Sequence, residues 1–339
     1  MIRRWVRRHP RVRAALRRVR AAWWALRGTD GAARATLTTS GGAYPRTFQV
    51  QPLPTPVDEI WADPPTSAAP FKRLASPEPA DPPRRYDVAL FEELNAEYAA
   101  KPIVIDAPRY DAASIAARSR GRIASVHDRI DLRNRTVLEV GCGSGYEVWH
   151  VAHQLGADAW GIDIDEREGW PALAGERVHL IAGDMADAVA LPSAAFDRAI
   201  SFTVWEHITR PLEAIAELAR VMRPGGLAWI RANLYRGPTA SHRYRDIHFP
   251  FPHLLFDDAV IDEAMARAGR MRGGSAWVNK LTWEQYEAAF ASSGLAIRSL
   301  SFDDYPLDGE FYLRFEDVLG RYPRADLQRG FFRVVLERR

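Results

Sequence analysis

Cysteine is almost absent from this chain of 339 residues, because Cys142 is its only one. A single cysteine excludes an intramolecular disulfide and a zinc site with several cysteine ligands, and it suits a reducing compartment such as the cytoplasm. The sequence also lacks any run of about 18 apolar residues, so nothing in it predicts a membrane-spanning helix. Since 47% of the residues are apolar, the chain can still bury the core of one large or two ordinary domains.

Acidic residues are missing from the first 29 positions, which contain ten arginines. Apolar residues recur there at helical spacing and share one helix face: Trp5, Val12, Leu16, Val19 and Trp23. A basic amphipathic helix with tryptophans is typical of an arm that binds an anionic membrane surface. For residues 1–29 we therefore predict peripheral attachment at the inner face of a membrane. Binding to nucleic acid, packing on the chain's own domain and fraying remain open alternatives.

Residues 30–85 follow as a predicted proline-rich linker or extended arm. Eleven of the 23 prolines fall between Pro45 and Pro83, and proline removes the backbone donor that a long helix needs. Aromatic residues such as Trp61 and Phe71 are unusual for a pure linker. We therefore expect part of this stretch to lie in extended form on the next domain.

The most informative stretch of the chain is 136–145. Thr136 to Val140 is a short β-branched and apolar run, which predicts a buried parallel strand. Three glycines then turn the chain into a helix that is expected to begin near Tyr146: Gly141, Gly143 and Gly145. A dinucleotide fingerprint would place its third glycine one residue later, so the spacing points away from a pyrophosphate ligand and from NAD.

This stretch resembles the glycine loop of class I S-adenosylmethionine (SAM)-dependent methyltransferases, E/D-x-G-x-G-x-G, which here begins at Glu139. Further motifs follow in the family's order: Trp160-Gly161-Ile162-Asp163, Ala182-Gly183-Asp184-Met185, Phe196 to Phe202, Trp205-Glu206-His207-Ile208 and Arg220 to Gly226. The resemblance covers about 86–339. It implies an α/β fold with a doubly wound, seven-stranded, mostly parallel sheet, an antiparallel last strand and an N-terminal helical cap over the cofactor pocket.

Several elements outside these motifs can also be predicted. Helices are expected around Leu90 to Tyr98 and over Ala112 to Ile130, and the last two strands at Ala296 to Phe302 and Phe331 to Leu336. Thr209 is the expected N-cap of one later helix, and Thr282 with Gln285 forms the expected capping box of another.

Residues 235–281 do not belong to the shared core of the family. The segment leaves the fifth strand at the carboxyl edge of the sheet, where the ligand pocket of such folds lies. It is rich in aromatic residues, arginines and histidines, and loops of this length are usually functional. We interpret it as a substrate-binding insert and predict that 235–258 forms a lid over the methyl group; a surface excursion is the alternative.

The resemblance implies that the cofactor is SAM. Its amino-acid tail and ribose are expected against the glycine loop, with Asp163 accepting from the ribose hydroxyls and Asp184 from the adenine amino group. The full predicted cofactor set is Glu139, Gly141, Cys142, Gly143, Gly145, Asp163, Ile164, Asp184, Met185 and Phe202.

Methyl transfer to a hydroxyl also needs a proton acceptor, and histidine is suited to that near neutral pH. The candidates are His207, His242, His248 and His253. His150 and His153 lie one helical turn apart, but no cysteine or acid completes a metal site with them, so no metal is predicted.

The acceptor class follows from what the fourth strand lacks. An Asn/Asp-Pro-Pro-Tyr motif, typical of enzymes that methylate the amino groups of nucleic-acid bases, is absent after Phe202, and Cys142 is misplaced for C5-pyrimidine chemistry. Both absences favour a small-molecule acceptor, or one linked to a lipid or sugar, over nucleic acid. An RNA methyltransferase that uses the basic arm, and a non-catalytic SAM-fold module tethered to a membrane, remain the alternatives.

Overall fold

The computed structural model describes residues 84–104, 112–188, 190–244, 246–267 and 279–339. The basic arm predicted for 1–29 and almost all of the predicted linker lie outside the described residues. Among the residues described, no helix has the length and apolar character needed to cross a bilayer.

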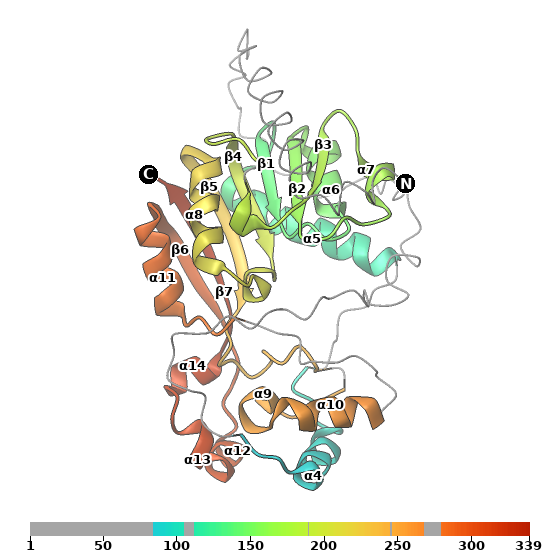
Figure 1. Ribbon diagram of the computed structural model, residues 1–339, viewed down its shortest axis with the longest axis vertical. Coiled ribbons are helices and arrows are strands. Elements are labelled where there is room, and N and C mark those ends of the chain that lie inside the picture. Colours follow the sequence, from blue (N-terminus) through green and yellow to red (C-terminus); the bar gives the residue numbers. More distant parts are fainter. Residues whose placement is uncertain (1–83, 105–111, 189, 245, 268–278) are drawn as a thin grey trace, which may run out of the picture.

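A seven-stranded sheet forms the centre of the larger lobe (Figure 1). Its strand order is β3-β2-β1-β4-β5-β7-β6, and β7 runs antiparallel to both of its neighbours. The sheet confirms the predicted doubly wound architecture. The strands are β1 (Thr136–Val140), β2 (Asp158–Asp163), β3 (Val178–Ala182), β4 (Phe196–Phe202), β5 (Met222–Asn233), β6 (Leu295–Asp304) and β7 (Arg329–Arg338).

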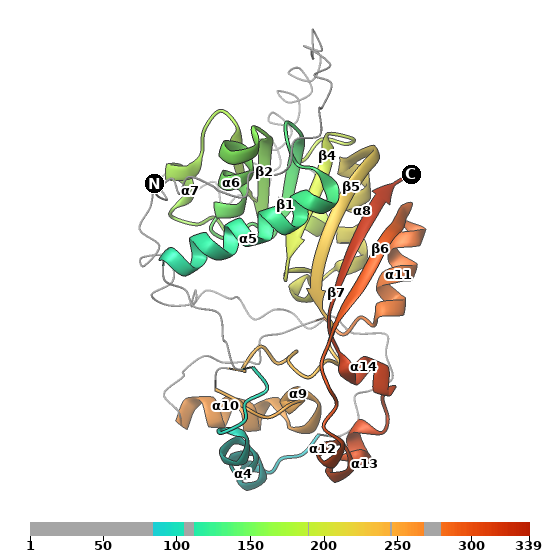
Figure 2. The same cartoon turned by 180° about the vertical axis from the view of Figure 1, so that it is seen from behind.

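Helices cover both faces of this sheet (Figure 2). Every residue of β1 is therefore buried, on whichever face its side chain lies. Leu138 and Val140 belong to the core beneath α8 (Pro211–Val221) and α11 (Trp283–Ser292). Val137 comes directly before Leu138 in the sequence and belongs to the core on the opposite face of the sheet. Three helices cover that face: α5 (Ala112–Ile130), α6 (Tyr146–Leu155) and the short α7 (Trp170–Leu173). The alternation of a strand thus supplies both cores from consecutive residues.

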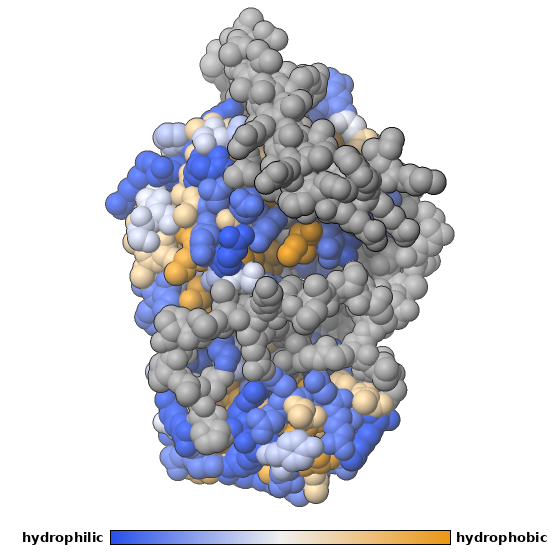
Figure 3. All heavy atoms as spheres, viewed as in Figure 1, coloured by the Kyte–Doolittle hydropathy of each residue, from blue (hydrophilic) through white to orange (hydrophobic). Residues whose placement is uncertain are grey.

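A smaller helical lobe lies beside the sheet, at the lower end of Figures 1 and 2. It combines three separate stretches of the chain into one hydrophobic cluster, in which Phe91 meets Phe249 and Phe256 edge to face at 5.3 Å. Its visible face in Figure 3 is mostly hydrophilic. The helices are α4 (Val88–Tyr98), α9 (Pro252–Leu255), α10 (Asp258–Arg267), α12 (Gly309–Arg314), α13 (Glu316–Leu319) and α14 (Arg324–Gln328).

This lobe corrects one expectation from the sequence. The helix at Leu90 to Tyr98 forms, but its buried side chains pack into the helical lobe instead of capping the cofactor pocket. The last two strands also form where expected, although 305–328, including α12, α13 and α14, lie between them.

The two predicted helix caps have different outcomes. Thr282 and Gln285 form a complete capping box at the start of α11, as predicted. Thr209 does not cap α8: that helix has Arg210 at the N-cap without a side-chain hydrogen bond and begins at Pro211. Proline suits the first helical position because it lacks the N–H that would otherwise need a partner there.

Candidate functional site

The glycine loop between β1 and α6 has the backbone conformation that its sequence requires. Gly141, Gly143 and Gly145 have φ values of +74°, +49° and +84°, in the left-handed region that favours glycine. A Cβ on Gly141 would lie 2.3 Å from the Val204 side chain, whereas a Cβ on Gly143 would meet nothing within 4 Å. The loop is therefore tight on its Gly141 side and open at Gly143, where a ligand can approach the backbone.

Asp163, at the end of β2, holds this loop in place. Its Oδ2 atom accepts a hydrogen bond from the backbone N–H of Gly143 at 2.8 Å. Arg167 lies 3.6 Å from the other carboxylate oxygen, Oδ1. The acid thus fixes the loop from the neighbouring strand and lies at the edge of the sheet where a ribose was predicted.

Glu139 lies beneath the loop and is almost completely buried. Its Oε2 atom has no hydrogen-bond partner among the described residues. Burial raises the pKa of Glu139 well above its usual range, and the nearby carboxylate of Glu147 raises it further, although Arg122 opposes both effects. A buried carboxylate oxygen without a partner is energetically unfavourable, so this position favours a ligand with a donor group such as an ammonium.

A cavity of about 660 Å³ adjoins the loop at the carboxyl edge of the sheet. Its walls come from β1 and the glycine loop, from α5, from the segment after β4, from β5, from the insert and from the neighbourhood of β6 and β7. The lining side chains are Val104, Arg118, Arg122, Glu139, Cys142, Ser144, Glu147, Phe202, Thr203, Glu206, His207, Arg231, Thr239, His242, Tyr244, Tyr305 and Phe331, together with the backbone of Gly141 and Gly143.

Two of the four predicted histidines meet in this cavity. His207 belongs to the 3₁₀ helix η2 (Trp205–His207), and His242 belongs to the insert; their ring centroids are 4.8 Å apart, edge to face. Burial lowers the pKa of His242 well below its usual range, and His207 lowers it further. His242 is therefore neutral at physiological pH, which is the form that accepts a proton or binds a metal.

The other two histidines do not line the cavity. The Nε2 atom of His253 lies 2.7 Å from the carbonyl oxygen of Tyr235, and burial lowers the pKa of His253 to about 4. The backbone N–H of His248 donates to the Asn95 side chain on α4. Both residues connect the insert to its own surroundings, so only His242 of the insert histidines reaches the cavity.

Glu206 was not among the predicted site residues. Its side chain is fully buried in the cavity wall, and neither carboxylate oxygen makes a hydrogen bond with normal geometry to a described residue. Burial raises the pKa of Glu206 to about 8, partly offset by the nearby backbone N–H groups of Glu206 and Asn233 and by Arg231. One carboxylate oxygen and one nitrogen from each of His207 and His242 lie within 4.8 Å of one another.

The cavity lining also includes arginine and aromatic side chains that sequence reasoning missed. Arg231 on β5 donates to Asp303 at 3.0 Å, and its guanidinium lies 3.7 Å from the centre of the Phe331 ring. Arg122 on α5 donates to Glu147 at 2.7 Å. Because both arginines already have carboxylate partners, much of their charge is compensated. For Arg231, its position near the carboxyl end of β5 could have indicated the site in advance, whereas Arg122 lies on helix α5 and had no such signal.

The predicted adenine-binding residues lie at the same edge of the sheet but outside the cavity lining. Asp184 accepts from the backbone N–H of Ala186 and from the guanidinium of Arg210, each at 2.9 Å. Ile164 is 60% exposed, and Met185 is buried. An exposed isoleucine next to Asp163 suits packing against a ligand ring, while Asp184 would have to share its carboxylate with Arg210.

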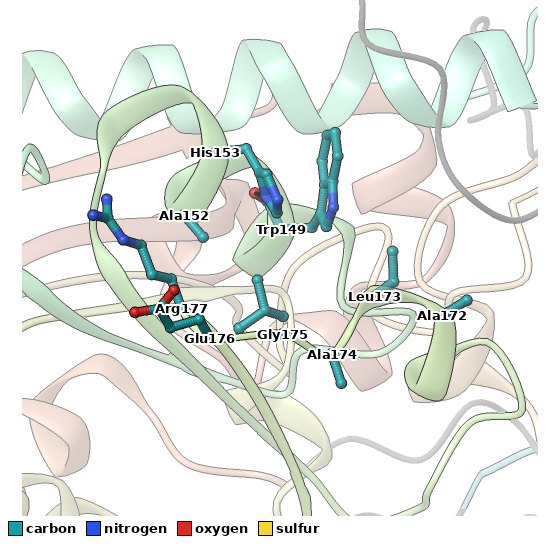
Figure 4. A pocket seen from close by; sticks show the side chains of 10 residues that line it. Trp149, Ala152, His153, Ala172, Leu173, Ala174, Gly175, Glu176 and Arg177 are labelled. Carbon is teal, nitrogen blue, oxygen red and sulfur yellow. Dashed lines mark hydrogen bonds between the residues drawn. The ribbon is translucent and has the colours of Figure 1, made fainter.

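A second cavity, of about 390 Å³, has a different lining (Figure 4). Its lining includes Trp149 and His153 on α6, Leu173 on α7 and the side chain of Arg177. The Trp149 and His153 rings stack at 4.3 Å. No residue of the glycine loop and none of the predicted site residues lines this cavity, so it is not the predicted cofactor site.

Comparison with known proteins identifies the part of the chain that carries this site. Residues 138–230 match the family model described as a methyltransferase domain. Residues 138–230 of this chain are a methyltransferase domain. SAM is the cofactor of class I methyltransferases, and the described residues fit it. The glycine backbone is open at Gly143, and a buried carboxylate oxygen of Glu139 has no hydrogen-bond partner among the described residues.

Curated relatives of the methyltransferase domain include proteins of different description. An uncharacterized methyltransferase from Mycobacteroides abscessus is 35% identical over 127 residues, which is 35% of this chain and 48% of the relative. A tRNA U34 carboxymethyltransferase from Shewanella woodyi is 35% identical over 102 residues, 28% of this chain and 30% of the relative. The chain therefore spans about half or less of the length of these relatives.

Solved structures are similar at a coarser level. An S-adenosylmethionine-dependent methyltransferase from Mesorhizobium loti is 16% identical, with a TM-score of 0.43 over 66% of this chain and 97% of that one. At this level of similarity, the fold assignment rests on the strand order of the sheet itself.

Proposed function

We propose that this protein transfers the methyl group of SAM to a hydroxyl of a small molecule, or of an acceptor linked to a lipid or sugar. One observation carries the proposal: the glycine loop lines the same cavity as His207 and His242. A donor held at Gly143 would therefore share a cavity with groups that can receive a hydroxyl proton.

The reaction is an in-line displacement, to which a protein contributes chiefly alignment and the exclusion of water. The acceptor oxygen uses a lone pair to form the new O–CH₃ bond. The S–CH₃ bond breaks and its electron pair stays on sulfur, which gives neutral S-adenosylhomocysteine. The hydroxyl proton leaves to a neutral imidazole, and His207 and His242 are the two histidines at the cavity wall.

The side chains that line the cavity favour an acceptor that contains an aromatic ring or a sugar. Tyr244, Tyr305 and Phe331 offer aromatic surface and hydroxyl groups, while Arg122 and Arg231 are already paired with Glu147 and Asp303. A cavity of about 660 Å³ also lies in the usual range for small-molecule sites.

The second candidate is methylation of RNA, which the relative described as a tRNA U34 carboxymethyltransferase favours. The match covers only 28% of this chain, so it concerns the shared domain rather than an acceptor site. The radiolabelling experiment described below therefore includes tRNA as a separate acceptor.

Binding tests the cofactor half of the proposal. Calorimetry with SAM, S-adenosylhomocysteine and NAD should give binding of the first two and none of the third. Affinity for NAD without a response to SAM would overturn it.

Radiolabelled SAM tests the acceptor half, with phenols, glycosides, lipid-linked sugars and total tRNA as separate acceptors. Label is expected in a hydroxyl-bearing small or lipid-linked acceptor. His207→Gln or His242→Gln should then lower turnover by about 10²–10⁴-fold with unchanged SAM affinity. His253→Gln is the matched control, because its ring bonds the insert backbone outside the cavity. Label in tRNA alone would replace this proposal with the second candidate.

A further inference from the structure

Two imidazoles and one carboxylate meet at the wall of the large cavity. Glu206 and His207 come from the segment after β4, and His242 comes from the insert 35 residues further along. One ligand atom from each lies within 4.8 Å of the others. Two histidines and one carboxylate form a known donor set for first-row metals, with coordination positions left open.

The state of Glu206 is the second, independent observation. It is fully buried and lines the cavity, yet both of its oxygens lack a hydrogen bond of normal geometry to a described residue. Buried carboxylates are normally paired, hydrogen-bonded or bound to a metal, because desolvation without compensation is unfavourable. A cation between Glu206 and the two histidines would supply the missing partner.

The backbone that carries two of the three ligands is held firmly. The side-chain amide of Asn279 donates to the carbonyl oxygen of Trp205 at 2.6 Å, and its backbone N–H donates to the carbonyl oxygen of Glu206 at 2.5 Å. The hydroxyl of Tyr286 in turn donates to the Asn279 side chain at 3.1 Å. Metal sites need ligands whose positions are fixed by surrounding contacts, and this buried network fixes η2 in that way.

We propose that Glu206, His207 and His242 bind one divalent first-row transition-metal ion, with an open coordination position facing the cavity. Imidazole nitrogens favour Zn²⁺, Fe²⁺ or Co²⁺ over Mg²⁺, which prefers oxygen ligands. An oxygen of the acceptor would take the open position, where the ion would lower the pKa of the hydroxyl. In that metal-bound state His207 and His242 would act as ligands and no longer as proton acceptors, because a neutral imidazole has only one nitrogen lone pair. This role of the ion rests on the proposed function, whereas metal binding itself does not.

The experiment titrates EDTA-treated, dialysed full-length protein with ZnCl₂, CoCl₂ or MgCl₂ in the absence of SAM. Calorimetry should give one equivalent of Zn²⁺ and of Co²⁺, with much weaker binding of Mg²⁺. The visible absorption of bound Co²⁺ reports on its nitrogen ligands. Glu206→Gln and His242→Ala should each weaken binding by at least about 10–100-fold, the loss expected even for partners outside the ligands themselves.

His179→Gln is the matched control, because His179 and Asp158 form a histidine–carboxylate pair at 2.8 Å elsewhere on the sheet. This variant should bind Zn²⁺ like the wild type. Thermal melting without metal establishes that each variant is folded, and Zn²⁺ should raise the Tm of the wild type but not of the isosteric Glu206→Gln protein.

Two results would overturn the site: no Zn²⁺ or Co²⁺ bound by the folded wild type, or binding unchanged in both folded ligand variants. The proposed function fails separately. Protein that binds SAM but neither Zn²⁺ nor Co²⁺ would retain the proposed function and overturn the metal site. Protein that binds Zn²⁺ or Co²⁺ but not SAM would retain the metal site and overturn the proposed function.

Discussion

The Oδ2 atom of Asp163 and the backbone N–H of Gly143 are joined by a hydrogen bond of 2.8 Å. This bond connects the end of β2 to the open point of the glycine loop, so the acid predicted to bind a ribose also positions the loop that is predicted to bind the cofactor. Its substitution should therefore affect SAM binding in two ways.

Asp163→Ala should weaken SAM binding by about 1–3 kcal/mol, because it removes a carboxylate partner and frees the Gly143 N–H. Asp163→Asn keeps one acceptor oxygen and should lose less. Calorimetry measures both. Asp158→Ala, at the other end of β2, is the control and should bind SAM normally. An unchanged dissociation constant for Asp163→Ala would show that the predicted ribose contact is wrong.

Two glycine substitutions should separate binding from stability. Gly143→Ala adds a methyl group that meets no protein atom within 4 Å, so the protein should fold at a strain of about 1–2 kcal/mol but bind SAM much more weakly. A Cβ on Gly161 would lie 2.7 Å from the Sγ atom of Cys142, so Gly161→Ala should destabilise by about 1–3 kcal/mol through overpacking. Denaturant unfolding and calorimetry measure the two effects, and normal SAM affinity in Gly143→Ala would contradict the first.

His150 on α6 predicts a dependence of stability on pH. Both ring nitrogens are buried without a partner among the described residues, and burial lowers the pKa of His150 to about 4. Below about pH 6.5 the imidazole of His150 is protonated in the unfolded chain but stays neutral in the folded chain. Its contribution to the free energy of unfolding is therefore fully present above that pH and is lost as the pH falls toward 4. The loss from this residue is about 3 kcal/mol at most.

Urea unfolding of His150→Leu between pH 4 and 8 should show a flatter pH dependence than the wild type. Gln154→Leu places the same new side chain on the same helix without changing a titratable group, so it should keep the wild-type slope. Equal slopes in His150→Leu and the wild type would assign the acid sensitivity to other groups.

The basic arm remains a prediction from the sequence, since residues 1–29 lie outside the described residues. Deleting them should leave SAM binding intact and reduce association with anionic vesicles by about 1 kcal/mol for each basic residue near the surface. The association should weaken as salt rises. Full-length protein that ignores vesicles but shifts RNA in a gel at the same salt would assign the arm to nucleic acid.

The sequence by itself determined the sheet and the glycine loop. The strand at Thr136 to Val140, the glycines after it and the acid at Asp163 follow one another closely. Each reflects a local rule: a continuous β-branched and apolar run, backbone freedom or position at a strand end. The capping box at Thr282 was predictable for the same reason, because its two partners are three residues apart.

Only the tertiary structure decided what faces the glycine loop. Glu206 and His242 lie 36 positions apart, and Tyr305 and Phe331 reach the same cavity from a different part of the chain. The helical lobe likewise joins Phe91, Phe249 and Phe311 from three stretches. Local periodicity says which side of an element is apolar but not which distant element covers it. The long-range packing of the sheet and helices decides that, and with it which histidines and arginines meet in the cavity.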